Sequence, residues 1–191
     1  MKQLEDRIKT DGTTLGTGVL KVDAFLNHQV DPELMDGMAK EWKHRLGDAP
    51  VTKIVTLESS GIAPALMLAK HYGVDMVFAR KQKSITMDDS VYTAEVYSFT
   101  KQVSRTITIS KSFLHADDHI VIVDDFLANG EAALGLCQVV EQAGATVTAI
   151  AIVIEKSFQP GRDKLTEQHY RVESLARIAS LDKDNIQFIP Q

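Results

Sequence analysis

The sequence has a single cysteine and no long apolar run. Cys137 has no second cysteine to pair with, so an internal disulfide is impossible, and one cysteine is too few for a cysteine-rich zinc site. No run of about 18 apolar residues is present, and the starting residues MKQLEDRIKT lack the apolar centre of a signal peptide. These absences favour a protein of the reducing cytoplasm with no membrane partner.

Basic residues are too few and too scattered for a nucleic-acid-binding surface. The 21 Lys and Arg residues are outnumbered by 26 Asp and Glu residues, which gives a formal net charge of -5, and no run of five or more basic residues occurs. We therefore expect no nucleic-acid partner. With 191 residues, 44% of them hydrophobic, the chain can form one full-sized core, so we expect a single domain over 1–191.

Apolar runs that alternate with helical patterns indicate an α/β fold. Strands are predicted at 52–57, 75–79, 119–123 and 147–155, and helices at 1–9, 32–46, 61–73 and 131–144. Because these strands are apolar on both faces, they imply a parallel sheet that helices cover on both sides, with ligands at the carboxyl ends of the strands. Alternating residues at 91–109 predict a β hairpin or a long mobile flap, whereas 20–29 has no amphipathic period and is expected to be loop-like.

The most informative stretch is VIVDDFLANGEA, residues 121–132. An apolar strand predicted to end at Val123 is followed by Asp124 and Asp125, and 128–132 then turns into a helix. Backbone amides at a helix start bind anions, and Gly130 lets the backbone approach a phosphate closely. Adjacent buried carboxylates need hydroxyl donors or a cation beside such an anion, and a sugar phosphate with a free diol or a Mg²⁺-bound ligand provides them. The alternative is that the two aspartates only cap the helix.

Two other strand ends carry patterns that suit anions. Residues 59–61, between a strand and a helix, offer backbone amides to a second phosphate, although an ordinary turn with serine caps has the same pattern. Arg80, Lys81 and Lys83 cluster after the strand 75–79, where a solvated basic turn is the alternative. Together with the acidic motif, these patterns make a ligand with two phosphate-sized groups plausible.

Six blocks in chain order resemble the type I phosphoribosyltransferases, and more narrowly their bacterial xanthine subgroup. They are LKVDAFLNHQVDPELM, KIVTLESSGIAPA, VFARKQKS, YSFTKQ, DDFLANGEAA and VIEKSFQPGRDKL with YRVESLARI. Six matches in order are more specific than one acidic motif. The resemblance implies a twisted parallel sheet flanked by helices, with a small hood from 1–30 and 155–191 and a mobile β flap. It also implies transfer of a phosphoribosyl group from 5-phosphoribosyl 1-diphosphate (PRPP) to xanthine.

The resemblance implies roles for the residues that match the family's motifs. Asp124 and Asp125 would hold the ribose hydroxyls and favour a cationic ribosyl transition state. The residues it implies for PRPP are Ala128, Asn129, Gly130, Glu131, Ala132, Ser59, Ser60, Gly61, Arg80 and Lys81. Those it implies for the base are Leu20, Asn27, Lys156 and Phe158.

Several of these assignments have structural alternatives. Lys156 is equally explained as a strand-end surface lysine, Asn27 as a turn residue and Phe158 as a core residue. Glu131 is expected to point to solvent while its charge favours the helix dipole. Lys101 and Arg105 in the flap either reach the diphosphate or are exposed hairpin charges.

Asn129 and Ala132 stand where the common motif of the family has threonine and a hydroxyl residue. Two side-chain donors to the phosphate are therefore missing, and backbone amides are expected to hold it. Mg²⁺ is expected to arrive with PRPP, with no metal ligand from the protein, and a homodimer is the expected assembly. Alternatives are the same reaction with guanine, hypoxanthine or adenine, or a non-catalytic PRPP-binding regulator, for which the chain offers no DNA-binding element.

Overall fold

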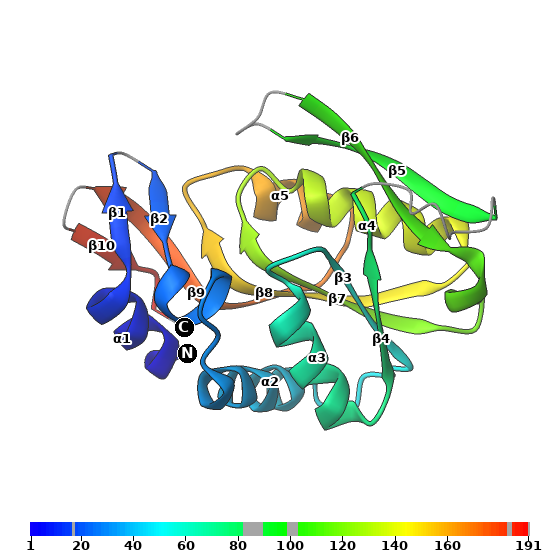
Figure 1. Ribbon diagram of the computed structural model, residues 1–191, viewed down its shortest axis with the longest axis horizontal. Coiled ribbons are helices and arrows are strands. Elements are labelled where there is room, and N and C mark those ends of the chain that lie inside the picture. Colours follow the sequence, from blue (N-terminus) through cyan, green and yellow to red (C-terminus); the bar gives the residue numbers. More distant parts are fainter. Residues whose placement is uncertain (17, 82–89, 99–102, 183–184, 191) are drawn as a thin grey trace.

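The computed structural model describes residues 1–16, 18–81, 90–98, 103–182 and 185–190. Within these residues a central sheet of six strands runs in the order β10-β9-β8-β7-β3-β4 (Figure 1). Its strands are β3 (Lys53–Leu57), β4 (Asp75–Ala79), β7 (His119–Leu127), β8 (Thr146–Lys156), β9 (Val172–Asp182) and β10 (Asn185–Phe188). The strands from β9 to β4 are parallel, and β10 pairs antiparallel with β9, so the sheet is mixed at one edge and parallel elsewhere.

Helices cover both faces of the sheet, as the apolar strands predict. The helices are α1 (Lys2–Asp11), α2 (Pro32–Leu46), α3 (Ile62–Tyr72), α4 (Glu131–Gln142) and α5 (Gly161–Glu167). In Figure 1, α1, α2 and α3 lie below the sheet, and α4 and α5 lie above it. The sheet separates two hydrophobic cores, a lower core on the side of α1, α2 and α3 and an upper core on the side of α4 and α5. Neighbouring strand residues alternate between them: Val121 packs in the lower core and Ile122 in the upper core.

The start and end of α2 follow from its capping residues. The Asp31 side chain accepts hydrogen bonds from the N–H groups of Glu33 and Leu34, both at 3.1 Å, and Pro32 is the first helical residue. Gly47 ends the helix at a φ of 60°. The buried face of α2 includes Trp42, so the helix packs its apolar side into the core.

The predicted hairpin exists and packs on α4. Its strands are β5 (Val91–Ser98) and β6 (Val103–Ser110), which pair antiparallel. Gly135 of α4 permits close contact, because a Cβ atom there would lie 2.4 Å from Cγ2 of Val96. The Gln142 amide donates a 2.7 Å hydrogen bond to Thr93 O, so the base of the hairpin is fastened to the end of the same helix.

The chain segments far apart in sequence meet at the edge of the sheet that carries β10. There β1 (Thr13–Leu15) and β2 (Val19–Lys21) form a small hairpin, followed by a π-helical turn, Asp23–Asn27. The Lys9 ammonium lies 5.3 Å from the centre of the Phe188 ring, which joins α1 to β10. The expectation of a loop at 20–29 is therefore wrong in part, because short-range pairing and a tight turn order most of it.

Two further differences concern strands. β7 continues through the two aspartates to Leu127, because Phe126 and Leu127 pair with residues of β8. The sequence predicts no strand after residue 155, yet β9 and β10 complete the sheet there.

Among the described residues, no helix is long and apolar enough to cross a membrane.

Candidate active site

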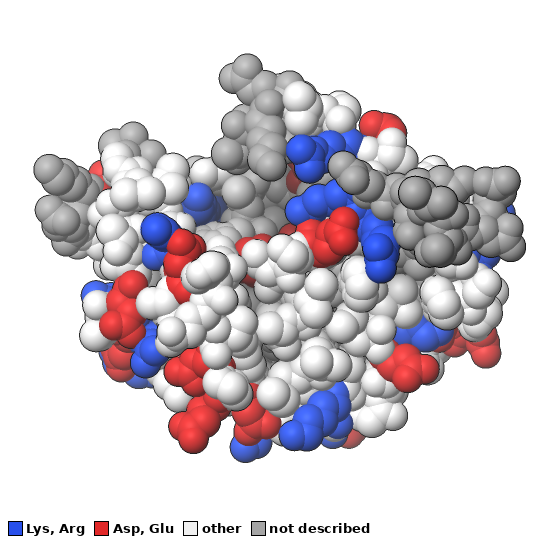
Figure 2. Space-filling view, viewed as in Figure 1, with Lys and Arg blue, Asp and Glu red and all other residues white. Residues whose placement is uncertain are grey.

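A cleft of about 280 Å³ lies between the β5–β6 hairpin and the carboxyl end of β7. Figure 2 shows the molecule hollowed on this side, with basic and acidic side chains along the hollow. Its lining residues are Leu57, Lys81, Val96, Tyr97, Arg105, Ile107, Asp124 and all of 126–133. The cleft thus combines a buried carboxylate, two cations and the start of a helix.

The two aspartates differ in their surroundings although they are adjacent. Asp124 is 7% exposed, and its Oδ1 accepts the Asp125 N–H at 3.0 Å. Asp125 is half-buried, and its Oδ1 accepts the Phe126 N–H at 2.9 Å. Burial first, and then the neighbouring Asp125 carboxylate, raise the pKa of Asp124 well above its usual range, while the Lys81 charge opposes this more weakly. A carboxylate so placed gains most from hydroxyl donors on a ligand.

The loop after β7 is shaped by a glycine that packs on another glycine. Gly130 immediately precedes α4 with a φ of 85°, and a Cβ atom there would lie 3.1 Å from Cα of Gly161. The N–H groups of the first turn of α4 lie at this end of the cleft, as expected for an anion site. Glu131 is partly exposed and does not face solvent alone, because its Oε1 lies 2.7 Å from Nζ of Lys164 on α5 and forms an ion pair with it.

The loop 58–61 and the residues after β4 are tied to each other. Glu58 Oε1 accepts the Lys81 N–H at 2.7 Å, and the Glu58–Ser59 peptide bond is cis. A Cβ atom at Gly61 would lie 2.2 Å from Oγ1 of Thr56, which itself hydrogen-bonds Val123 O at 2.7 Å. Gly61 therefore lets this loop sit directly against the strand end that carries Asp124.

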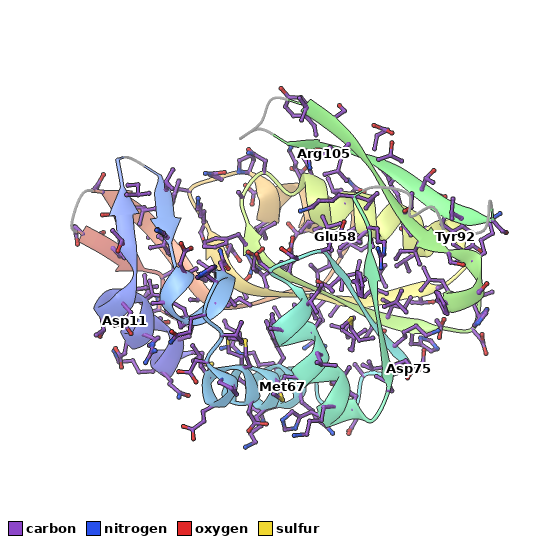
Figure 3. The ribbon with its side chains drawn as sticks, in the orientation of Figure 1. Asp11, Glu58, Met67, Asp75, Tyr92 and Arg105 are labelled. Atoms are coloured by element: carbon purple, nitrogen blue, oxygen red, sulfur yellow. The ribbon has the colours of Figure 1, made fainter. Side chains whose placement is uncertain are left out.

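The basic residues of the two predicted clusters take different positions. Lys81 and Arg105 line the cleft, where Arg105 is half-buried, and contact of either side chain with a diphosphate stays a prediction. In Figure 3, Arg105 lies above Glu58, on the side of the sheet that α4 and the hairpin cover. Arg80 is exposed and stacks on Phe78 at 5.4 Å, and it does not line the cleft. Lys83 and Lys101 fall outside the described residues.

Lys156, at the end of β8, lies one strand away from the aspartates. Its Nζ donates to Gly18 O at 2.8 Å and lies 5.5 Å from the centre of the Phe126 ring, which lines the cleft. Burial lowers the pKa of Lys156. An ammonium group has three N–H donors, so Lys156 can keep its bond to Gly18 and still donate to a ligand.

The other predicted base residues are more scattered. Leu20 is buried in the lower core, Asn27 is exposed at the end of the π-helical turn, and Phe158 is 43% exposed. None of the three lines the cleft, and neither do Asp125 or the loop 59–61. The structure therefore joins Asp124, the loop 128–132, Lys81 and Arg105 around one cleft, while the other predicted site residues that it describes do not line this cleft.

Glu155 and Arg162 escaped the sequence analysis. Glu155 is 1% exposed, and Arg162 donates to it through Nε at 2.9 Å and Nη2 at 2.6 Å. A buried glutamate at the end of an apolar strand was the available signal, because such a group is seldom buried without a partner.

No group of three or more His, Cys, Asp or Glu side chains in the described part of the chain is arranged to hold a metal ion. The two aspartates and the open cleft beside them suit a cation that arrives bound to phosphate oxygens, since Mg²⁺ is usually held by few carboxylates and by substrate phosphates.

Comparison with known proteins identifies the family. The phosphoribosyl transferase domain model matches residues 25–188. The chain belongs to the phosphoribosyltransferase family. It is 59% identical over 189 residues to a xanthine phosphoribosyltransferase of an Exiguobacterium strain, covering 99% of this chain and 98% of the relative. A xanthine phosphoribosyltransferase of Lacticaseibacillus casei is 56% identical over 191 residues, the full length of both chains.

Solved structures show the same fold for this phosphoribosyltransferase. The adenine phosphoribosyltransferase of Thermoanaerobacter pseudethanolicus matches with a TM-score of 0.77 at 24% identity, covering 91% of this chain and 99% of that one. That of Rhodothermus marinus gives 0.77 at 23% identity, covering 93% and 100%. The likeness confirms the predicted α/β class with its helix-flanked sheet.

Proposed function

We propose that this phosphoribosyltransferase is a purine salvage enzyme that converts xanthine and PRPP to xanthosine 5-monophosphate and pyrophosphate. The observation that carries the proposal is the buried Asp124 beside the glycine loop and helix start, in a chain whose full-length relatives are named xanthine phosphoribosyltransferase. In this reaction the bond from ribose C1 to the diphosphate oxygen breaks. A bond from C1 to a ring nitrogen of xanthine forms, and that nitrogen loses its proton.

Asp124 and Asp125 are the residues proposed to act on the ribose. Their carboxylates accept hydrogen bonds from the two ribose hydroxyls, which replaces the water that burial removes. Positive charge develops on the ribosyl ring as the diphosphate leaves, and two fixed carboxylates stabilise that charge without reorganisation. They are catalytic in this electrostatic sense.

The loop 128–132 is proposed to bind the 5-phosphate through N–H groups at the start of α4. Lys81 and Arg105 face the same cleft and supply positive charge for the diphosphate, and the loop 59–61, linked to Lys81 through Glu58, is proposed to add backbone amides. Mg²⁺, when bound with PRPP, neutralises charge on the leaving diphosphate. Closure of the hairpin over the ligand would exclude water.

The base is proposed to lie near Phe126 and Lys156. Lys156 Nζ points to this region from β8, and it can donate to the 6-oxo group of xanthine. Asn27, with a donor and an acceptor, and Leu20 and Phe158 are proposed to complete the pocket around the ring. The protein is also proposed to act in the cytoplasm as a homodimer, which sedimentation of the purified chain would test.

A reconstitution assay tests the function. The purified protein is mixed with PRPP, Mg²⁺ and xanthine, and pyrophosphate release is followed. We expect turnover that needs all three components. Turnover with guanine or hypoxanthine but not xanthine would overturn the base assignment and keep the PRPP site. PRPP binding without turnover on any base would indicate a regulator instead.

A further inference from the structure

The segment 155–164 touches both halves of the proposed site. Its first residue, Glu155 of β8, pairs with Leu127 of β7, which comes just before the loop 128–132, called the phosphate loop below. Lys156 follows Glu155 directly in the chain. Its last part is the start of α5, whose first residue, Gly161, packs on Gly130. One short stretch of chain therefore connects the base-side lysine with the phosphate loop.

A hydrogen bond, a close packing at glycine and an ion pair join α5 to the phosphate loop. The Gly161 N–H donates to Ala128 O at 2.9 Å. A Cβ atom at Gly161 would lie 2.4 Å from that same oxygen, so only glycine fits there. Lys164 of α5 forms the 2.7 Å ion pair with Glu131, the first residue of α4. The loop thus rests on α5 rather than being held by its own strand and helix alone.

Glu155 in turn fixes α5 to the end of β8. Arg162 donates to both carboxylate oxygens through Nε, each at 2.9 Å, and to Oε2 through Nη2 at 2.6 Å. Arg177 of β9 donates to Oε1 at 3.0 Å and Ser157 donates at 2.6 Å, so the buried carboxylate is surrounded by donors. A bidentate Arg–carboxylate pair fixes orientation as well as distance.

We propose that the Glu155–Arg162 pair is a positioning device that sets the place of the phosphate loop relative to Lys156, so that loss of the pair weakens PRPP binding and base binding together. Neither side chain lines the cleft, and both act through the groups they hold. The expected effect on xanthine binding rests on the proposed function. The expected effect on PRPP affinity requires only that the protein binds PRPP.

The test compares Arg162→Ala with Arg171→Ala. Arg171 forms a 2.8 Å ion pair with Glu173 in β9 and donates to Arg45 O at 2.8 Å, so its loss removes one partly exposed Arg–Glu pair and one hydrogen bond to the backbone. PRPP affinity is measured by calorimetry without base, the KM for xanthine by initial rates, and folding by circular dichroism at the assay temperature. For Arg162→Ala we expect both constants to rise about ten-fold or more, because small misplacement of binding groups is costly. For Arg171→Ala we expect less than about a two-fold change, as is usual for exposed pairs.

Further variants separate the effect on PRPP affinity from the effect on the KM for xanthine. Lys164→Ala breaks only the contact to Glu131, so it should raise the PRPP dissociation constant and leave the KM for xanthine unchanged. Arg162→Lys keeps the charge but loses the bidentate geometry, so it should move both constants less than Arg162→Ala. If Arg162→Ala does not fold, Arg162→Lys and Glu155→Gln are judged by the same criterion.

A lower melting temperature with both constants unchanged would overturn the proposal and leave Arg162 a purely structural residue. A rise in the KM for xanthine alone would overturn it as well, because the phosphate loop would then not depend on the pair. If the wild-type protein binds PRPP but does not use xanthine, the proposed function fails, and the calorimetric comparison still decides the effect on PRPP affinity.

Discussion

Two buried carboxylates at the ends of neighbouring strands have opposite surroundings. Asp124 on β7 is buried next to another carboxylate, and its pKa is raised well above the usual range, chiefly by burial. Glu155 on β8 is buried, and hydrogen bonds from Arg162, Ser157 and Ser174 overcome the effect of burial and lower its pKa to about 2. Glu155 accepts from several charged and hydroxyl side chains of the chain, whereas Asp124 accepts from the Asp125 N–H and its proposed further partners are ligand hydroxyls. The number of donors around each carboxylate, rather than its burial, distinguishes the acid proposed to be catalytic from the structural one.

The largest expected effect comes from removing charge at the reactive end. Asp124→Asn combined with Asp125→Asn keeps the size of both side chains, so the fold should remain. Turnover should fall by at least about a hundred-fold, because the charge that stabilises the ribosyl cation is lost. Steady-state rates of pyrophosphate release measure this. Asp75→Asn, an exposed aspartate at the far end of β4 (Figure 3), is the control. Near-normal turnover of the double variant would remove the aspartates from the mechanism.

The next effect concerns the glycine loop beside Asp124. Gly130→Val places a branched side chain at a φ of 85° and against Gly161, so PRPP binding should be lost in calorimetry. Gly144→Ala is the control, because Gly144 has a φ of 75° and a similar close neighbour but lies after α4. It should lose stability and keep PRPP affinity. Equal loss of affinity in both variants would mean that backbone strain alone, not the loop position, weakens binding.

A smaller and more selective effect is expected at Lys156. Lys156→Ala should raise the KM for xanthine about ten-fold or more, the usual cost of losing a charged hydrogen bond, and leave PRPP affinity near normal. Initial rates at saturating PRPP measure the first quantity and calorimetry the second. Lys40→Ala removes an exposed lysine paired with Asp36 and serves as the control. An unchanged KM would return Lys156 to the structural role that its bond to Gly18 already provides.

The smallest expected effects are on the free energy of unfolding. Its dependence on pH has opposite signs for Glu155 and Asp124. Because the folded-state pKa of Glu155 lies near 2, below its ordinary value of 4.5, its contribution to stability is present above pH 4.5 and is lost as the pH falls towards 2. Glu155→Gln should therefore flatten this acid branch. Because the pKa of Asp124 is raised, the wild type loses stability as the pH rises from about 4 towards that pKa, and Asp124→Asn should not. Urea unfolding at several pH values measures both, and slopes of the same sign would contradict the comparison.

The phosphate side of the site could be predicted because it is local in sequence. A strand, two acids, a glycine and a helix follow one another within 121–132. The parallel sheet places the acids and the glycine towards the carboxyl ends of its strands. The loop 59–61 follows the same local order of strand and helix, but it does not line the cleft and its role stays a prediction. What periodicity missed was the continuation of β7 to Leu127, because its pairing with β8 decides where the strand ends.

The base side could not be built from the sequence in the same way. Lys156 meets Gly18 across 138 positions of the chain, and β9 and β10 lie in a stretch whose mixed pattern predicts no strand. Glu131 and Glu155 have partners at Lys164, Arg162 and Arg177, and nothing local in the sequence indicates these pairs. Only the resemblance to the family named the base residues, and their roles stay a prediction.

A base competition experiment tests the central claim most directly. Equal concentrations of xanthine, guanine, hypoxanthine and adenine are given to the enzyme with limiting PRPP and Mg²⁺, and the product nucleotides are separated by chromatography. We expect xanthosine monophosphate as the main product, with its share reduced in Lys156→Ala. Adenosine monophosphate as the main product, or no nucleotide from any base, would contradict it.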